Sequence, residues 1–314
     1  MSKLTKWSCL FLRWAKILVG RSYYHHPQRL GKIFQPGELV GYFNDLTPKI
    51  YWHGYTDEDN IPVNLLPDGR KIYFATTIVQ KAIGHWDKWL LTRNAKDKED
   101  FLNLCHWLLL RQDSNGGWPI WSELNMDFPS PYSAMTQGEC ISAFVRAWKL
   151  TSDTVFAEGA KRAIKLMCKP LENGGTAIIE RNSFFLEEMP TIPRSTILNG
   201  WIFALFGLYD FWLAFKDENV NELFRLSLNT LKRHLHEYDS GYWSYYDVWR
   251  IASPFYHDLH IHQLTAISLI DDDPLFVEFR NRWIRYQKIW KNRIKALGIK
   301  FIQKLREPGE MIVK

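Results

Sequence analysis

The chain has 314 residues, a formal net charge of +6 and an isoelectric point near 9.0, which allow one large domain and favour a polyanionic partner. Its cysteines, Cys9, Cys105, Cys140 and Cys168, form no CxxC pair, so the sequence suggests neither a zinc site nor a disulfide framework, and a reducing compartment is expected. An aromatic share of 15%, with 15 tryptophans, favours an acidic polysaccharide over nucleic acid, because flat rings stack on sugar rings and no RNP or helix-turn-helix signature is present.

The N-terminal part of the chain has a basic amphipathic start. The apolar stretch 7–19 is interrupted by Arg13 and Lys16, whereas a cleavable signal peptide keeps its apolar core uncharged. The pattern predicts a helix that either lies on an anionic membrane surface or packs against the main domain. Residues 31–70 are broken by proline and glycine and are expected to form an irregular wrapping arm. The sequence contains no run of about 20 uncharged apolar residues, so no membrane span is predicted.

The rest of the chain is predicted to be helical, because the apolar residues recur at helical spacing from about Ile72 onward. Helices are expected over 74–92, 98–112, 133–150, 154–168, 195–215, 219–236, 258–269 and 274–304. The predicted division is an amphipathic helix and arm over residues 1–70, followed by a catalytic domain over residues 71–314.

Three breaks between the predicted helices resemble one another. They are Asn115-Gly116-Gly117-Trp118, Asn173-Gly174-Gly175-Thr176 and Asp239-Ser240-Gly241-Tyr242-Trp243, and each follows the second helix of a pair. Glycine supplies the turn, and a short strand or hairpin is expected after it. A recurring helix hairpin predicts an all-α fold, an (α/α) toroid or barrel of about four helix pairs with short β-hairpins in the connections.

Four segments carry a resemblance to a known family: Tyr132–Gly138, Glu187–Gly200, Tyr246-Asp247 and Tyr256–Leu264. In this order they resemble the C-terminal catalytic domain of the D-glucuronyl C5-epimerases, from about Ile61 to Ile284. The resemblance implies an (α/α) barrel. It also implies an isomerase that converts D-glucuronate to L-iduronate within a heparan sulfate-like or heparosan-like glycosaminoglycan, with no cofactor. Animal members carry β domains ahead of this region, where only a short arm is expected here, as in a short bacterial-type member.

The implied reaction needs a base on one face of the sugar ring and an acid on the other. The resemblance assigns these roles to Glu188 and Tyr256, and it places Tyr246 as a further catalytic residue that hydrogen-bonds the uronate. Glu188 precedes a helix start, which is expected to favour its ionised form. The Tyr256 phenol needs a nearby cation, such as Arg250 or His257, to lower its pKa.

The resemblance also implies a set of substrate-binding residues: Asn199, Arg250, His257, His260, Tyr132 and Gln137. Arg250 lies one residue beyond the position of a family arginine, where this chain has Trp249. Met189 stands where the animal enzymes have a third tyrosine. No metal site is expected, because His257 and His260 have no carboxylate at ligand spacing on their helix face.

Two other functions stay open at this stage. A polysaccharide lyase begins with the same proton abstraction and then expels the C4 substituent, and an inactive glycan-binding subunit would explain Met189. In each case the expected partner is an anionic uronate-containing polysaccharide and not nucleic acid. A homodimer is left open. The expected location is the cytoplasm, at the inner face of the membrane if the basic start makes peripheral contact.

Overall fold

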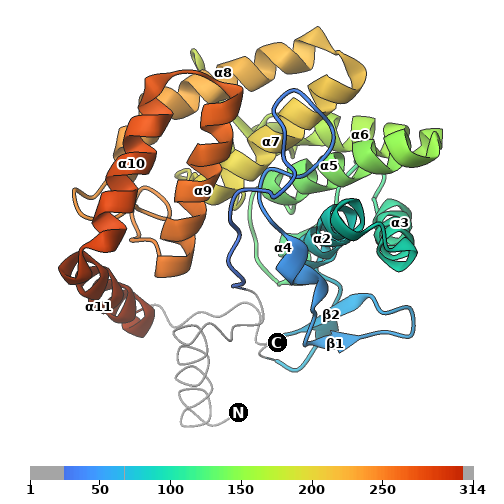
Figure 1. Ribbon diagram of the computed structural model, residues 1–314, viewed down its shortest axis with the longest axis horizontal. Coiled ribbons are helices and arrows are strands. Elements are labelled where there is room, and N and C mark those ends of the chain that lie inside the picture. Colours follow the sequence, from blue (N-terminus) through green and yellow to red (C-terminus); the bar gives the residue numbers. More distant parts are fainter. Residues whose placement is uncertain (1–24, 67, 307–314) are drawn as a thin grey trace.

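The computed structural model describes residues 25–66 and 68–306, so the helix predicted within 7–19 lies outside the described residues. Helices dominate this part of the chain, in the order shown by Figure 1. They are α2 (Ala75–Thr92), α3 (Ala95–Leu110), the short α4 (Ile120–Glu123), α5 (Ala134–Thr151), α6 (Thr154–Met167), α7 (Leu198–Phe215), α8 (Glu218–His234), α9 (Pro254–Ile270), α10 (Pro274–Lys288) and α11 (Trp290–Arg306).

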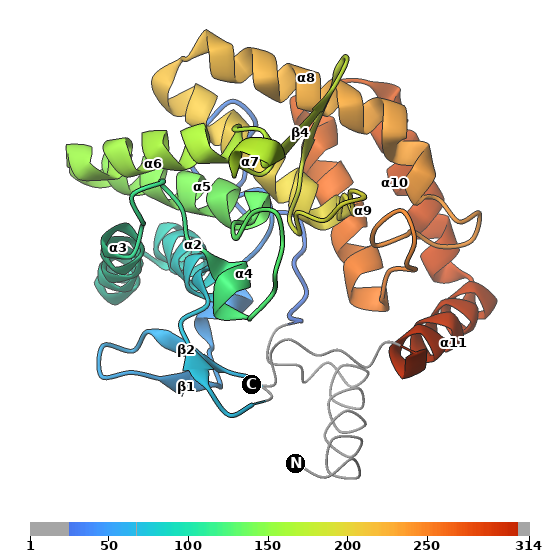
Figure 2. The ribbon, with the colours of Figure 1, turned by 180° about the vertical axis from the view of Figure 1, so that it is seen from behind.

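The predicted all-α fold of paired helices is confirmed. Within the described residues, α2–α3, α5–α6, α7–α8 and α9–α10 each form a packed pair, and the first helix of each pair packs against the first helix of the next. The pairs follow one another around an arc, as Figures 1 and 2 show from opposite sides, which is the arrangement of an (α/α) toroid. The helix expected over 274–304 is wrong as a single element, because Ile289 leaves the helical conformation and divides it into α10 and α11. Two predicted starts also differ, since α9 begins at Pro254 and not at 258, and α7 begins at Leu198 and not at 195.

Short polar side chains start several of these helices. Asn94, Ser133, Asp153 and Asp217 each accept a hydrogen bond from a backbone N–H in the first turn of the helix that follows. Ser253 does the same for α9, accepting from the N–H of Tyr256. These caps satisfy donors that the helix itself leaves unpaired, so local sequence fixes the starts of these five helices.

The inner helices α5 and α7 approach closely because glycines lie at their contact. A side chain at Gly207 would collide with the backbone of Gly138, and one at Gly138 would lie 2.7 Å from the Cα of Ala204. Helix α7 is long and apolar enough to cross a membrane, yet 78% of it is buried inside the protein. Its Asp210 forms a buried ion pair with Arg146 of α5. These features are those of a central core helix.

The strands are short and lie in the connections. Strands β1 (Tyr55–Thr56), β2 (Pro62–Leu65) and β3 (Lys71–Ile72) form an antiparallel sheet, with Tyr55 opposite Val63 and Asn64 opposite Ile72. Strands β4 (Ala177–Glu180) and β5 (Ser183–Leu186) form a hairpin beside α8 (Figure 2). The hairpin follows the second glycine turn as predicted, whereas the first turn leads into α4 and the third into isolated bridges such as the one between Asp239 and Ser244. Short 3-10 helices, η1 (Thr47–Ile50), η2 (Leu171–Asn173) and η3 (Leu235–Tyr238), complete the connections.

The N-terminal arm runs inside the arc of helices, as the blue segment of Figure 1 shows. Phe43 stacks on Phe206 of α7 with ring centroids 4.0 Å apart, and the backbone N–H of Tyr42 donates to Asp87 of α2 at 3.0 Å. At the other end of the arm, the ring of His25 lies 4.8 Å from that of Phe255 in α9. The arm thus contacts the first and the last helix pair and contributes to the core between them.

Candidate functional site

The structure brings together five of the residues that the sequence singled out: Glu188, Asn199, Tyr246, Arg250 and Tyr256. Asn199 and Tyr256 lie in the first turns of α7 and α9, and the other three lie in the loops that precede these helices. Backbone hydrogen bonds join these loops to the helix starts. The N–H of Leu198 donates to the carbonyl of Tyr246 at 3.0 Å, and the N–H of Ala134 donates to the carbonyl of Glu187 at 2.9 Å. The site therefore lies where the inner helices begin.

The position of Glu188 is set by its neighbours. The indole N–H of Trp121 donates to the Glu188 carbonyl at 3.1 Å, and the Asn199 amide donates to its Oε2 at 3.4 Å. Gly200 supplies the room for this side chain, because any side chain at position 200 would collide with the Glu188 carboxylate.

The adjacent Glu187 has a different environment. It is fully buried, and its carboxylate accepts hydrogen bonds from the backbone N–H of Thr196 at 2.8 Å and from the Thr196 hydroxyl at 2.6 Å. The Ser195 hydroxyl donates to the same carboxylate at 3.2 Å. Glu187 thus ties the loop to the start of α7 and leaves Glu188 as the carboxylate of the site.

Burial decides the protonation state of Glu188. It raises the pKa of this carboxyl to about 8, with a further increase from the charge of Glu187, while Arg250 and the Asn199 hydrogen bond act in the opposite direction. The helix start was expected to favour the ionised form, but the desolvation cost is the larger effect here. A carboxylate with a pKa near 8 is a much stronger base than an exposed one, which suits proton abstraction near neutral pH.

Two tyrosines lie together beside this carboxylate. The rings of Tyr246 and Tyr256 have centroids 4.6 Å apart. Burial raises the pKa of Tyr246 well above its ordinary value, and the charge of Glu188 raises it further. Tyr246 therefore keeps its proton at neutral pH and can donate a hydrogen bond or a proton to a bound anion.

Arg250 supplies a cation to the same cluster. Its Nε donates to Asp247 Oδ2 at 2.7 Å, and its guanidinium lies 5.9 Å from the centroid of the Tyr246 ring. Asp247 is itself buried and accepts the backbone N–H of Trp249 at 2.9 Å, so the loop holds the guanidinium in place. Trp249, which stands at the position of the family arginine, is 70% exposed.

The two predicted histidines lie in the core behind the site. His257 stacks on Trp243 with ring centroids 3.7 Å apart, accepts from the backbone N–H of Ser244 at 3.1 Å, and contacts the carbonyl of Trp283 through Nε2 at 3.1 Å. Burial lowers the pKa of His257 to about 3 and that of His260 well below its ordinary value. Both rings are fully buried, and Ser244 lies between their Nδ1 atoms. In this arrangement they support the loop that carries Tyr246, and their assignment to substrate binding stays a prediction.

Tyr132 and Gln137 also lie apart from the cluster. The Gln137 amide donates to the carbonyls of Gly116 and Ala163 at 3.1 and 3.3 Å. The Tyr132 hydroxyl donates to Asp113 at 2.6 Å. Both side chains thus hold the first glycine turn against the start of α5, and their assignment to substrate binding stays a prediction.

Sequence reasoning missed a second buried carboxylate next to Glu188. Glu139 of α5 is fully buried, and its Oε1 accepts from the Gln80 amide of α2 at 3.0 Å, while its Oε2 has no hydrogen-bond partner in the described part of the chain. Burial raises the pKa of Glu139 to about 8, and the charge of Glu188 raises it too. Lys49 of the arm is the cation that acts on Glu139, and burial lowers its pKa to about 8. The available signal was that Glu139, directly after Gln137-Gly138, is the single acidic residue of the segment 134–151.

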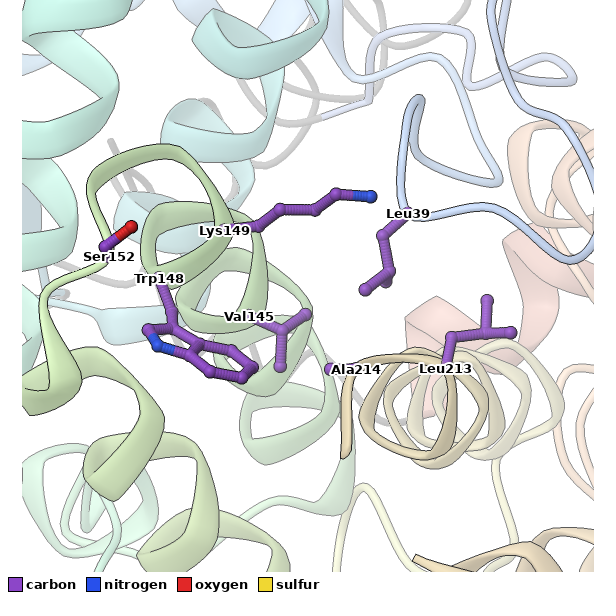
Figure 3. A pocket seen from close by; sticks show the side chains of 7 residues that line it. All are labelled: Leu39, Val145, Trp148, Lys149, Ser152, Leu213 and Ala214. Atoms are coloured by element: carbon purple, nitrogen blue, oxygen red, sulfur yellow. The ribbon is translucent and has the colours of Figure 1, made fainter. Parts of the chain in front are cut away.

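A pocket away from this cluster carries no carboxylate, tyrosine or histidine for this chemistry. It measures about 480 Å3, and α5 and α7 supply most of its wall near their C-terminal ends (Figure 3). Trp148 and Lys149 come from α5, Leu213 comes from α7, and Leu39 of the arm lies across from them. No group of three metal-ligating side chains is found anywhere in residues 25–66 and 68–306.

Comparisons with known proteins match the helical region. A family model described as D-glucuronyl C5-epimerase C-terminus matches residues 112–285. The D-glucuronyl C5-epimerase of Caenorhabditis elegans is 30% identical over 220 residues, which cover 62% of this chain and 36% of that protein. An uncharacterized protein of Methanocaldococcus jannaschii is 24% identical over 218 residues, covering 62% of this chain and 70% of that one. A solved UGL chain with the saccharide dGlcA-Glc-Rha-Glc has a TM-score of 0.43 and 14% identity, over 71% of this chain and 61% of that one.

Proposed function

Since this chain belongs to the D-glucuronyl C5-epimerase family, we propose that it inverts C5 of D-glucuronate to give L-iduronate within a polysaccharide. The family match covers residues 112–285, which include every residue of the cluster around Glu188. The observation that supports the reaction best is the position of Glu188, a partly buried carboxyl whose pKa is raised to about 8, beside the paired rings of Tyr246 and Tyr256. This arrangement offers a base and proton donors without a redox group.

In the proposed reaction, ionised Glu188 removes the proton from C5 of the uronate. The electron pair of the broken C–H bond passes into the neighbouring carboxylate and gives an enediolate dianion. Tyr256 then donates its phenolic proton to the opposite face of C5, which inverts the centre and restores the carboxylate. Exchange with solvent returns Glu188 to its ionised form and Tyr256 to its protonated form.

The charge that develops on the substrate carboxylate needs donors and cations around it. We assign this role to the Tyr246 hydroxyl and the Arg250 guanidinium, with the Asn199 amide as a further donor. Tyr246 suits the role because burial keeps its proton in place. Arg250 suits it because Asp247 holds the guanidinium beside the Tyr246 ring.

Proton NMR of heparosan incubated with the protein in D2O tests the proposal. Deuterium at C5, new iduronate signals and unchanged chain length are the expected results. Glu188→Gln and Tyr256→Phe should each slow the exchange by about a hundredfold or more, because each removes one proton-transfer group. Chain shortening with an unsaturated uronate end would instead establish a lyase.

Met189 favours a second candidate, an inactive glycan-binding subunit. A thioether has no titratable proton, and Met189 is half-buried against the core next to Glu188. This candidate predicts polymer binding that is unaffected by Glu188→Gln and no exchange at C5 with any of several uronate polymers. Detectable exchange would eliminate it.

A further inference from the structure

A second pocket, of about 420 Å3, lies between the arm and α2. Its wall includes His26, Lys32, Thr47, Tyr51, His53 and Lys88. Only Lys88 comes from a long helix; the others belong to the arm, in the part of the chain that runs inside and beside the arc of helices. The volume lies within the usual range of ligand sites.

One wall of this pocket is connected through the arm to the catalytic cluster. The ring of His25 packs against Tyr256 with centroids 5.7 Å apart, and the next residue, His26, lines the pocket. Tyr51, another residue of the pocket wall, follows closely after Lys49 in the sequence. The charge of Lys49 acts on Glu139, which in turn acts with Glu188. A polymer that enters the cluster can therefore extend into the pocket.

The chemistry of the pocket suits an anionic sugar. Lys32 is held by Asp45 at 3.0 Å and by the Thr47 hydroxyl at 3.3 Å, while Lys88 makes no ion pair within the described residues. The wall thus carries two ammonium groups, and the carboxylates that act on Lys32 are Asp45 and the buried Asp87. Burial raises the pKa of Asp87 to about 7, so Asp87 is only partly ionised at neutral pH and the lining keeps a positive charge. Tyr51 is 59% exposed and offers an open ring face on which a pyranose can stack.

We propose that this pocket is a flanking subsite that binds an anionic sugar of the same polymer whose uronate reacts at Glu188. The proposal rests on the proposed function, since it takes the polymer from it. Lys88 and Lys32 bind the carboxylate or sulfate of the flanking sugar, and Tyr51 stacks on its ring. Because these contacts are remote from C5, they strengthen substrate and transition-state binding equally and lower KM without changing kcat.

Calorimetric titration with a short and a long heparosan oligosaccharide tests the subsite. Lys88→Met and Tyr51→Ala should each weaken binding of the long oligosaccharide by about two- to fivefold and reduce its advantage over the short one. Tyr51→Phe should bind as the unmodified protein does, because it keeps the ring. The matched control is Lys149→Met in the other pocket, which should change neither titration. If the unmodified protein, Lys88→Met and Tyr51→Ala each bound the short and the long oligosaccharide with the same affinity, the proposal would be overturned.

The titrations measure binding and need no catalytic turnover, so the subsite and the C5 reaction can each be refuted independently of the other. A length-dependent loss of affinity without C5 exchange keeps the subsite and overturns the reaction. Exchange with an unchanged KM for the long polymer in Lys88→Met keeps the reaction and overturns the subsite. N-sulfated and unsulfated heparosan distinguish the two anions: a larger effect of Lys88→Met on the sulfated chain assigns the pocket to sulfate, and equal effects assign it to carboxylate. A single-stranded oligonucleotide that competes as well as heparosan would overturn the sugar assignment.

Discussion

Replacing Gly200 tests the position of Glu188 directly. A Cβ at this position would lie 2.5 Å from Glu188 Cβ and 2.9 Å from its Cδ, whereas ordinary van der Waals contact begins at 3.4 Å. The carboxyl of Gly200→Ala must therefore move by about 1 Å. A misplacement of this size in a reacting group costs about a hundredfold in rate. We expect Gly200→Ala to slow deuterium incorporation into heparosan C5 by about this factor.

The same substitution should leave the fold in place. Alanine is favoured over glycine inside a helix by about 1 kcal/mol, which offsets part of the strain at the start of α7. Gly298→Ala in α11 is the matched control, because a Cβ there has no neighbour within 4 Å. It should raise the melting temperature slightly and leave the exchange rate unchanged.

The assay pairs NMR exchange rates with thermal unfolding of each variant. Gly200→Ala that melts like the unmodified protein but exchanges slowly supports the argument. If Gly200→Ala exchanged deuterium as fast as the unmodified protein, the assigned position of Glu188 would be refuted, since Glu188 would then act from some other position or not at all. Glu188→Gln fills the same space and removes only the base, so it separates a steric effect from a chemical one.

Two predictions concern buried charges. Burial raises the pKa of Glu139 from an ordinary 4.5 to about 8, so the folded state holds a proton that the unfolded chain releases, and stability falls as the pH rises through this window. Glu139→Gln has no such proton to lose. In denaturant melts, the unfolding free energy of Glu139→Gln minus that of the unmodified protein should therefore increase by more than about 1 kcal/mol between about pH 5 and above about pH 8. A difference that stays constant with pH would contradict the burial argument. Arg146→Met leaves Asp210 buried without its ion pair and should cost about 3–5 kcal/mol of unfolding free energy. Lys161→Met, which breaks an exposed pair, should cost less than about 1 kcal/mol, and equal losses in the two variants would contradict the role of burial.

The paired helices could be predicted because local sequence determines them. Apolar spacing marked the helical segments, and capping residues such as Ser133 and Asp217 fixed where two of them begin. The course of the arm could not be predicted, since Phe43 and Tyr42 look like any aromatic pair until helices distant in sequence surround them. The break at Ile289 was missed for a related reason: the basic and apolar spacing continues through it from α10 into α11.

The candidate site was predictable in its residues but not in its electrostatics. Motif resemblance singled out Glu188, Tyr246 and Tyr256, and the structure places all three together. Their pKa values depend on burial, which no local pattern reports. Glu139 was missed because its importance comes from its closeness in space to Glu188, which lies far along the chain in the loop before α7.

The same packing that forms the core also determines the strength of the proposed base. Burial raises the pKa of both Glu188, in the loop before α7, and Glu139, in α5, and the arm brings Lys49 to Glu139. Lys49 stabilises an ionised Glu139, whereas each carboxylate opposes the ionisation of the other, so the pair is expected to release its protons in two separate steps. Replacing Lys49 by methionine removes this cation, so the pKa of Glu139 should rise further above its ordinary value. A carboxyl NMR titration of Glu139 that is the same in Lys49→Met and in the unmodified protein would show that the arm contributes only packing.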